Sequence, residues 1–206
     1  MDREERRDRV LYLFRKGARV IALDGRAASG KSTLSEDVRK VMDVDIVHMD
    51  DFFLPKELRT PERFLEPGGN VHYERFISEV IEPLSLGLPF SYRVFSCSTM
   101  DYGASVHIDG RKPVIVEGSY ALHYRMPKYW DHSFFLDVDK EEQITRLEKR
   151  CPEKLEAFRT RWIPLEEAYI AATSVLERAD EIVLRPGLSR EEKKKYHRQK
   201  RNRPYG

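Results

Sequence analysis

The chain has 206 residues, of which 40% are hydrophobic and 35% are charged, and its formal net charge is +2. This length suits a single α/β domain with a buried core, and the hydrophobic content excludes a disordered chain. The near-neutral charge gives no general case for nucleic acid as a partner. Two cysteines exclude a disulfide framework, and no apolar run reaches the length of a membrane span. The charged first residues are not typical of a signal peptide, so we expect a soluble, cytoplasmic protein.

Three elements are predicted at the start of the chain. A charged helix is expected over residues 2–16, with an apolar stripe of Val10, Leu11, Leu13 and Phe14. The apolar run at residues 19–23 predicts a buried strand. Residues 34–42 predict an amphipathic helix, whose apolar face holds Leu34, Val38, Val41 and Met42.

Between that strand and that helix lies Gly25-x-x-x-x-Gly30-Lys31-Ser32, the spacing of a phosphate-binding P-loop. Such a turn aims several backbone N–H groups at one anion, and glycine lets the backbone approach it closely. Lys31 can reach the β- and γ-phosphates, and the Ser32 hydroxyl can bind Mg²⁺. An ordinary glycine-rich turn, the alternative, makes Lys31-Ser32 a coincidence. We therefore predict a nucleotide site, with these ATP-binding residues: Gly25, Ala28, Ser29, Gly30, Lys31, Ser32 and Thr33.

A second buried strand is predicted over residues 44–49, and it runs directly into Asp50 and Asp51. Ligands of parallel α/β sheets bind at the carboxyl ends of the strands. A carboxylate there lies opposite the P-loop and is placed to act on an acceptor. We assign this chemistry to Asp50, the first residue beyond the strand, and expect Asp51 to cap the following turn.

The middle of the chain predicts a surface excursion, a helix and a hairpin. Residues 56–72 are polar and rich in Pro and Gly, and a helix is expected from Tyr73 to about residue 81, ending before Pro83. Short strands at residues 88–98 and 106–108, with a turn at residues 101–103, predict a hairpin at about residues 88–110. Four of its side chains are candidates for an acceptor pocket, although packing is their commoner role: Tyr92, Arg93, Tyr102 and His107.

Residues 113–118 predict a buried strand that ends in Glu117. A carboxylate at a strand end beside a P-loop suits the Walker-B role, in which it orients Mg²⁺ or its waters. Further strands are expected at residues 132–138 and 181–184, and a helix at residues 140–150 that carries Arg146.

A helical lid is predicted at about residues 151–165. Leu155, Phe158 and Trp162 recur at helical spacing, and Pro164 suits the first turn of a new helix, with Glu166 and Glu167 complementing its dipole. Arg159 and Arg161 flank Thr160 just before Trp162. A solvated basic face is the alternative, but this position favours a lid that closes over the phosphates.

The last residues differ from the rest in charge. Residues 189–206 hold eight Lys or Arg and two Glu, a net charge of +6. We expect one domain over residues 1–188, followed by a solvated basic tail. Contact of the tail with RNA phosphates or with an acidic face of a partner subunit is the alternative.

Five ordered segments resemble the uridine kinase family, which belongs to the phosphoribulokinase/uridine kinase group of P-loop kinases. They are residues 25–33, 50–53, 114–118, 162–169 and 179–183. The resemblance covers residues 19 to about 187. It implies a P-loop NTPase fold with a five-stranded parallel sheet flanked by helices, a small β-hairpin and a mobile helical lid. It also implies that ATP, with Mg²⁺, donates its γ-phosphoryl group to the 5′-hydroxyl of a nucleoside.

The resemblance implies roles for individual residues. Asp50 matches the carboxylate that orients and deprotonates the hydroxyl. Ser32 and Glu117 match magnesium-site residues, to which we add Asp50. The phosphate-clamping lid region includes Arg146, Arg159 and Arg161, and Lys31 completes the catalytic set. The acceptor-site candidates are Asp50, Phe53, His72, Tyr92 and Arg93.

Two departures leave the acceptor open. Family members carry an acidic residue near the helix that begins at Tyr73, where this chain offers His72, and the arginine-rich lid loop is shortened to residues 151–154. A uridine or cytidine kinase is our first hypothesis. A kinase for another small alcohol, such as pantothenate, a sugar phosphate or nicotinamide riboside, is the second, and an ATP-dependent RNA-binding regulator is the third. ATP versus GTP stays open, and so does a homo-oligomer; neither a membrane nor nucleic acid is expected as a partner.

Overall fold

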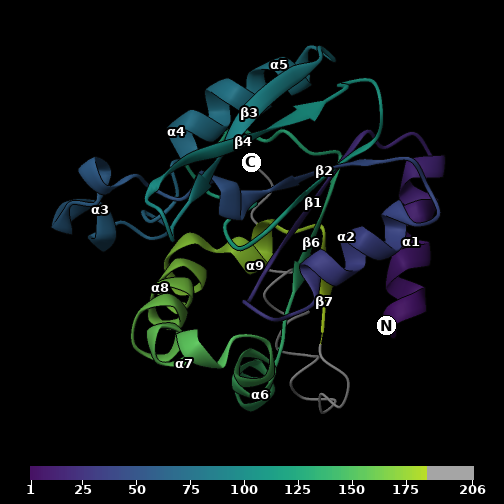
Figure 1. Cartoon of the computed structure of the whole chain (residues 1–206). Coiled ribbons are helices and arrows are strands. Elements are labelled where there is room, and N and C mark those ends of the chain that lie inside the picture. Colours follow the sequence, from purple (N-terminus) through teal and green to yellow (C-terminus); the bar gives the residue numbers. More distant parts are fainter. Residues whose placement is uncertain (185–206) are drawn as a thin grey trace.

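A computed structural model describes residues 1–184, so the basic tail predicted at residues 189–206 lies outside the described residues. The central sheet has five parallel strands in the spatial order β2-β5-β1-β6-β7 (Figure 1). Their bounds are β1 Val20–Gly25, β2 Asp45–His48, β5 Val114–Glu117, β6 His132–Leu136 and β7 Glu181–Val183. The predicted five-stranded parallel α/β sheet is therefore confirmed.

Helices cover both faces of this sheet, and a separate hairpin stands beside it (Figure 1). The α-helices are α1 Arg3–Arg15, α2 Lys31–Arg39, α3 Pro61–Leu65, α4 Tyr73–Phe76, α5 Glu82–Ser85, α6 Lys140–Arg150, α7 Leu155–Ala157, α8 Ile163–Thr173 and α9 Val175–Arg178. Short 3₁₀ turns are η1 Met49–Phe52, η2 Lys56–Leu58 and η4 Pro152–Lys154, and π-helical turns are η3 Ile77–Ile81 and η5 Phe158–Trp162. The hairpin strands are β3 Phe90–Ser96 and β4 Asp101–Ile108.

The two faces of the sheet hold two separate hydrophobic clusters. Along β1, Ile21 and Leu23 pack against α1 and α2, whereas Val20 and Ala22 face the other side. That other cluster includes side chains of α4, η3, α5, the hairpin, α8 and α9. Because both faces are covered, the central strand is hydrophobic without alternation, as is usual for parallel sheets.

The first two helices follow the predicted pattern except at one residue. Asp2 caps α1 and forms a capping box with Glu5. On α2, Leu34 and Val38 are buried, but Val41 is 59% exposed. The expectation that Val41 lies on the apolar face is wrong, because the helix ends at Arg39 and the helical repeat stops before residue 41.

Asp37 ties α2 to α1 through an ion pair. Arg3 Nε lies 2.5 Å from Asp37 Oδ2, and Lys40 Nζ lies 3.1 Å from Asp37 Oδ1. The hydrogen bond from Arg3, together with the one from Lys40, holds the pKa of Asp37 below its ordinary value. The Arg3 side chain is 68% exposed, so water and salt screen this pair.

A lowered pKa in the folded state stabilises the protein above the unfolded-state pKa, about 4 for Asp, and this contribution disappears as the pH falls through the folded-state pKa. We therefore expect Asp37→Asn to lower the midpoint of thermal unfolding slightly at neutral pH. The difference in unfolding midpoint between Asp37→Asn and the wild type should disappear in acid and become smaller in high salt. Unfolding followed by circular dichroism against pH tests this, and a gap that stays constant into acid contradicts it.

Two prolines lie inside continuous helical stretches. The helix that begins at Tyr73 was expected to end before Pro83, but it runs through η3 and on to Ser85. Proline in a regular helix clashes with the carbonyl four residues earlier. The wider π-helical turn directly before Pro83 changes the hydrogen-bond register there. The same arrangement recurs where η5 precedes Pro164 at the start of α8.

The hairpin and the segment before it also differ from expectation. The turn lies at residues 97–100, where Met100 has a φ of 57°, and residues 101–103 belong to β4. The segment 56–72 is not wholly a surface excursion, because residues 68–71 are buried and Val71 forms an isolated β-bridge with Phe53. Glycine and polar residues indicate turns but not whether a turn is covered.

Candidate active site

The P-loop joins β1 to α2 in a strained turn that requires glycine. A Cβ on Gly25 would lie 2.2 Å from the carbonyl oxygen of Leu136, so the close approach of β6 leaves no room for a side chain. Gly30 has a φ of 100°, in the left-handed region, and α2 begins directly after it. Lys31 Nζ donates hydrogen bonds to the carbonyl oxygens of Gly25 at 2.7 Å and Arg26 at 2.8 Å. The ammonium group is therefore held against the loop.

The carboxyl ends of three neighbouring strands meet beside this loop. In the sheet register, Glu117 at the end of β5 pairs with Leu23 on one side and with His48 on the other. The Ser32 hydroxyl lies 3.0 Å and 3.1 Å from the two carboxylate oxygens of Glu117. His48 Nδ1 lies 2.6 Å from Glu117 Oε1. Three strand ends thus bring the predicted P-loop hydroxyl and the predicted strand-end carboxylate into contact.

The charge of Glu117 is favoured by its neighbours. Burial alone would raise the pKa of Glu117, but the hydrogen bond with His48 and the charge of Lys31 outweigh burial and lower it. The same hydrogen bond raises the pKa of His48. Glu117 is therefore kept as a carboxylate beside the P-loop.

Asp50 lies in the turn that follows β2 and lines a cavity with the P-loop and Glu117. Part of its surface is exposed to that cavity, but the protein around the cavity still removes much of its hydration. This burial raises the pKa of Asp50, and the charge of Glu117 raises it further, while Lys31 opposes the rise. A raised pKa makes Asp50 a stronger base than an ordinary surface aspartate.

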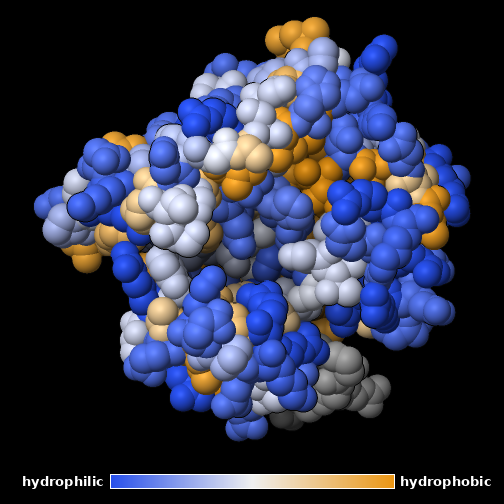
Figure 2. Space-filling model, viewed as in Figure 1, coloured by the Kyte–Doolittle hydropathy of each residue, from blue (hydrophilic) through white to orange (hydrophobic). Residues whose placement is uncertain are grey.

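The cavity has a volume of about 650 Å³ and lies between the P-loop, the hairpin side and the helices α6 to α8. Figure 2 shows the hollow near the middle of the view, with mostly hydrophilic residues around it. The volume is in the range of small-molecule sites. Among the predicted ATP-binding residues, those that line it are Ala28, Gly30, Lys31, Ser32, Thr33 and Arg146.

Comparison with solved structures identifies the fold. A possible uridine kinase from Bacillus stearothermophilus superposes with a TM-score of 0.67 over 89% of this chain and 100% of that chain, at 18% sequence identity. The chain has the α/β fold of P-loop kinases. A deoxyadenosine kinase from M. mycoides with bound dATP covers the same shares at 14% identity, but its TM-score of 0.41 is too low to carry an argument. No protein-family model and no curated protein sequence matches the chain.

One wall of this cavity comes from residues 146–166, but not from the two arginines that we expected. The lining side chains recur at every fourth residue: Arg146, Arg150, Lys154, Phe158, Trp162 and Glu166. Arg159 and Arg161 are exposed and do not line the cavity, and the Arg161 guanidinium lies over the rings of Phe64 and Trp162. The role of Arg159 and Arg161 in turnover stays a prediction.

Removing the charge of Arg150 should lower turnover more than nucleotide affinity, because negative charge is spread over the equatorial oxygens of the transferred group in the transition state. We expect Arg150→Ala to reduce kcat about tenfold or more. Lys149→Ala is the matched control, since it removes the same charge from the same helix outside the cavity. Equal effects of the two substitutions on kcat contradict the assignment. The same kinetics on Arg159→Ala and Arg161→Ala decide whether those arginines act as the sequence predicts.

The residues that we expected to bind an acceptor are only partly together. Phe53 lines the cavity beside Asp50, but Tyr92, Arg93 and His72 do not. Tyr92 is 2% exposed, and its hydroxyl donates a hydrogen bond to Asp51 at 3.1 Å. His72 caps α4 by accepting a hydrogen bond from the Arg75 N–H. Arg93 donates to the carbonyl oxygen of Tyr102. Structural partners therefore engage all three side chains.

Two buried carboxylates have roles that the sequence pattern does not indicate. Glu166 was expected only to complement a helix dipole, but it is 4% exposed and its carboxylate accepts hydrogen bonds from the Ala27 N–H at 2.6 Å and the Ser119 hydroxyl at 2.9 Å. Asp24, at 1% exposure, accepts a hydrogen bond from the Tyr169 hydroxyl at 2.8 Å. Burial raises the pKa of both groups. Together they tie α8 to the P-loop and to the strand before it.

Outside this site, the described residues give two negative findings. No helix among them combines the length and hydrophobicity that a membrane span requires. Within residues 1–184, no group of three or more His, Cys, Asp or Glu side chains forms a metal-binding cluster.

Proposed function

We propose that this protein is an ATP-dependent small-molecule kinase that transfers the γ-phosphoryl group of ATP to an alcohol. Our first hypothesis for the acceptor is the 5′-hydroxyl of a pyrimidine nucleoside. One observation carries the proposal. The P-loop residues Lys31 and Ser32 share a single cavity with two carboxylates, Glu117 at the end of β5 and Asp50 in the turn that follows β2. A phosphate site and a base within one small-molecule cavity are the parts that phosphoryl transfer to an alcohol needs.

Phosphoryl transfer asks the protein mainly to position the reactants and to neutralise charge. The backbone of the P-loop and the Lys31 ammonium bind the β- and γ-phosphates. Asp50 accepts a hydrogen bond from the acceptor hydroxyl, orients it and takes its proton as the new P–O bond forms. The bond between the γ-phosphorus and the β–γ bridging oxygen breaks in the same transfer, and ADP is the leaving group. The cavity-lining cations Arg146, Arg150 and Lys154 balance the charge that spreads onto the phosphoryl oxygens.

The residues beside the P-loop fit Mg²⁺ bound together with a nucleotide. Mg²⁺ keeps several waters and is usually held by one or two carboxylates plus substrate phosphates. Ser32 and Glu117, which touch each other, and Asp50, whose pKa the charge of Glu117 raises, offer such a donor set. Bound there, Mg²⁺ would neutralise negative charge on the β- and γ-phosphates.

The acceptor is the finer part of the proposal. The fold neighbour that is named a possible uridine kinase supports a nucleoside. His72 does not line the cavity, so it offers no contact that would favour a nucleoside. Other small alcohols, including pantothenate, sugar phosphates and nicotinamide riboside, therefore stay as the second hypothesis. An ATP-dependent RNA-binding regulator has no use for a base beside the phosphate site, so Asp50 argues against it.

A screen of the purified protein for ADP release tests the proposal. We expect release that depends on one class of acceptor when nucleosides and small alcohols are offered in turn, with ATP and GTP as donors in parallel. The reaction without acceptor is the control. Release that no acceptor increases contradicts the proposal.

A further inference from the structure

The cavity contains a buried amide whose oxygen has no partner. Asn70 is 4% exposed and lines the cavity. Its Oδ1 forms no hydrogen bond within the described residues, 1–184. Among the buried side-chain atoms without a partner there, it is the one whose residue lines this cavity. Buried polar atoms are nearly always paired, so an unpaired one in a cavity wall indicates a ligand group that pairs with it.

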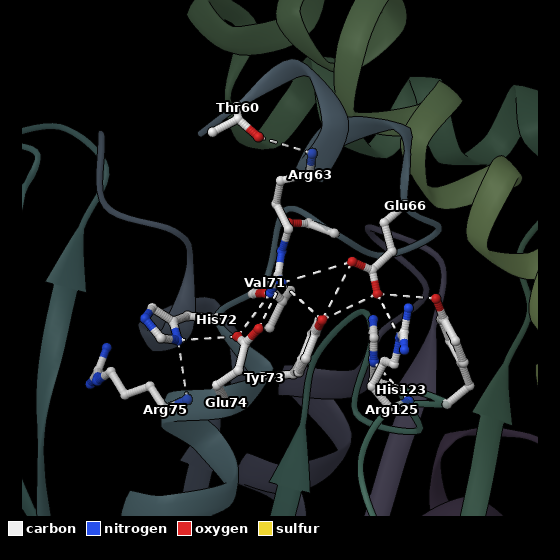
Figure 3. A network of polar contacts seen from close by, with 12 residues as sticks. Thr60, Arg63, Glu66, Val71, His72, Tyr73, Glu74, Arg75, His123 and Arg125 are labelled. Carbon is white, nitrogen blue, oxygen red and sulfur yellow. Dashed lines mark hydrogen bonds and ion pairs between the residues drawn. The ribbon is translucent and has the colours of Figure 1, made fainter. Parts of the chain in front are cut away.

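The loop around Asn70 is held firmly by one guanidinium group. Arg63 donates from Nε to the carbonyl oxygen of Gly69 at 2.9 Å. It also donates from Nη2 to the carbonyl oxygen of Val71 at 2.9 Å (Figure 3). The two carbonyls that flank Asn70 are therefore fixed by the same side chain. Glu74 pairs with this guanidinium at 2.7 Å, and the Leu54 N–H donates to the carbonyl oxygen of Asn70 itself. The backbone that carries the amide is thus held in place on both sides of Asn70.

The surroundings of Asn70 decide which ligand chemistry fits. Burial raises the pKa of Tyr120, and the contact with the Asn70 side chain opposes this rise. The charge of Asp50 also raises the pKa of Tyr120. The Leu54 N–H donates to the Asn70 carbonyl, and Val71 forms a β-bridge with Phe53, so Asn70 lies beside the segment that follows Asp50. A hydroxyl both donates and accepts, so it pairs with the amide whichever end faces the cavity.

From these contacts we infer that Asn70 binds a second hydroxyl of the acceptor, distinct from the one that is phosphorylated. The inference rests on the proposed function and narrows its acceptor to molecules with at least two hydroxyl groups. Asn70 then orients the acceptor, while Asp50 acts on the reacting hydroxyl.

The test compares an acceptor found in the screen with its analogues that each lack one hydroxyl. For the wild type, we expect removal of one particular hydroxyl to lower kcat/KM about tenfold or more, because the amide is then left unpaired. In Asn70→Leu, which keeps the volume but removes both polar atoms, acceptor and analogue should react equally well. The KM for ATP should not change. A variant that discriminates as the wild type does overturns the inference.

Two further variants separate recognition from loss of structure. Asn70→Ala repeats the test in case leucine disturbs the loop, and thermal unfolding checks that both variants fold. His123→Leu is the matched control, because it removes another buried polar atom without a partner, next to the same loop but outside the cavity lining. It should discriminate as the wild type does; lost discrimination there overturns the role of Asn70. If the wild type phosphorylates no acceptor, the proposed function itself fails, and the inference with it.

Discussion

Lys31→Ala is expected to lower kcat by about 10³-fold, the scale seen when a group that stabilises transition-state charge is removed. Lys31 is 7% exposed, and its ammonium is fixed by two carbonyls of the P-loop. The other cations in the cavity wall come from residues 146–154, and Arg146, which reaches the loop, already donates to the carbonyl oxygen of Ala28 at 3.1 Å. The backbone N–H groups remain in the variant, so nucleotide affinity should fall much less than kcat.

Kinetics and nucleotide binding measured on the same preparation check this result. Lys40→Ala is the control, because Lys40 lies at the end of the same helix and pairs with Asp37 away from the cavity. It should keep near-normal turnover. Near-normal turnover in a folded Lys31→Ala protein contradicts the assignment of the P-loop as a phosphate site.

The second large effect is expected at Asp50. Asp50→Asn keeps the shape and volume of the side chain but cannot take the proton of the acceptor hydroxyl. Loss of a general base typically costs 10²- to 10⁴-fold, so we expect kcat to fall by about 10³-fold while ATP still binds. Asp51 is the neighbouring carboxylate, and it is engaged by the buried hydroxyl of Tyr92.

Asp51→Asn is therefore the matched control, and its effect on kcat should be much smaller. Titration of each variant with nucleotide, followed by steady-state kinetics with the acceptor, separates binding from transfer. If Asp51→Asn loses transfer and Asp50→Asn keeps it, the choice of base is reversed.

The sequence predicts the fold well because its signals are local. Apolar runs bounded by turn residues indicate each strand of the sheet, and the helix at Lys140–Arg150 has the predicted bounds. The P-loop spacing places Lys31 and Ser32 at a strand–helix junction, and the rule that parallel strands share a carboxyl edge brings Glu117 and Asp50 beside them.

The missed features depend on contacts between distant segments. Tyr92 and Asn70 are both polar residues of the segments around the cavity, yet Tyr92 packs inward on Phe52 and only Asn70 lines the cavity. Arg63 holds the carbonyls on either side of Asn70, and no local sequence pattern indicates this contact. In the lid, helical spacing from Arg146 by fours would have found Arg150 and Lys154. That pattern crosses a short 3₁₀ turn, where the sequence predicted a loop rather than a continuous face.

The most direct measurement follows the γ-phosphate of ATP. The protein is incubated with ATP and the best acceptor of the screen, and all products are identified by mass spectrometry. We expect the acceptor to gain one phosphoryl group for each ADP released, and this product to be absent with Asp50→Asn. ADP accompanied only by inorganic phosphate, with every acceptor unmodified, would contradict phosphoryl transfer to an alcohol.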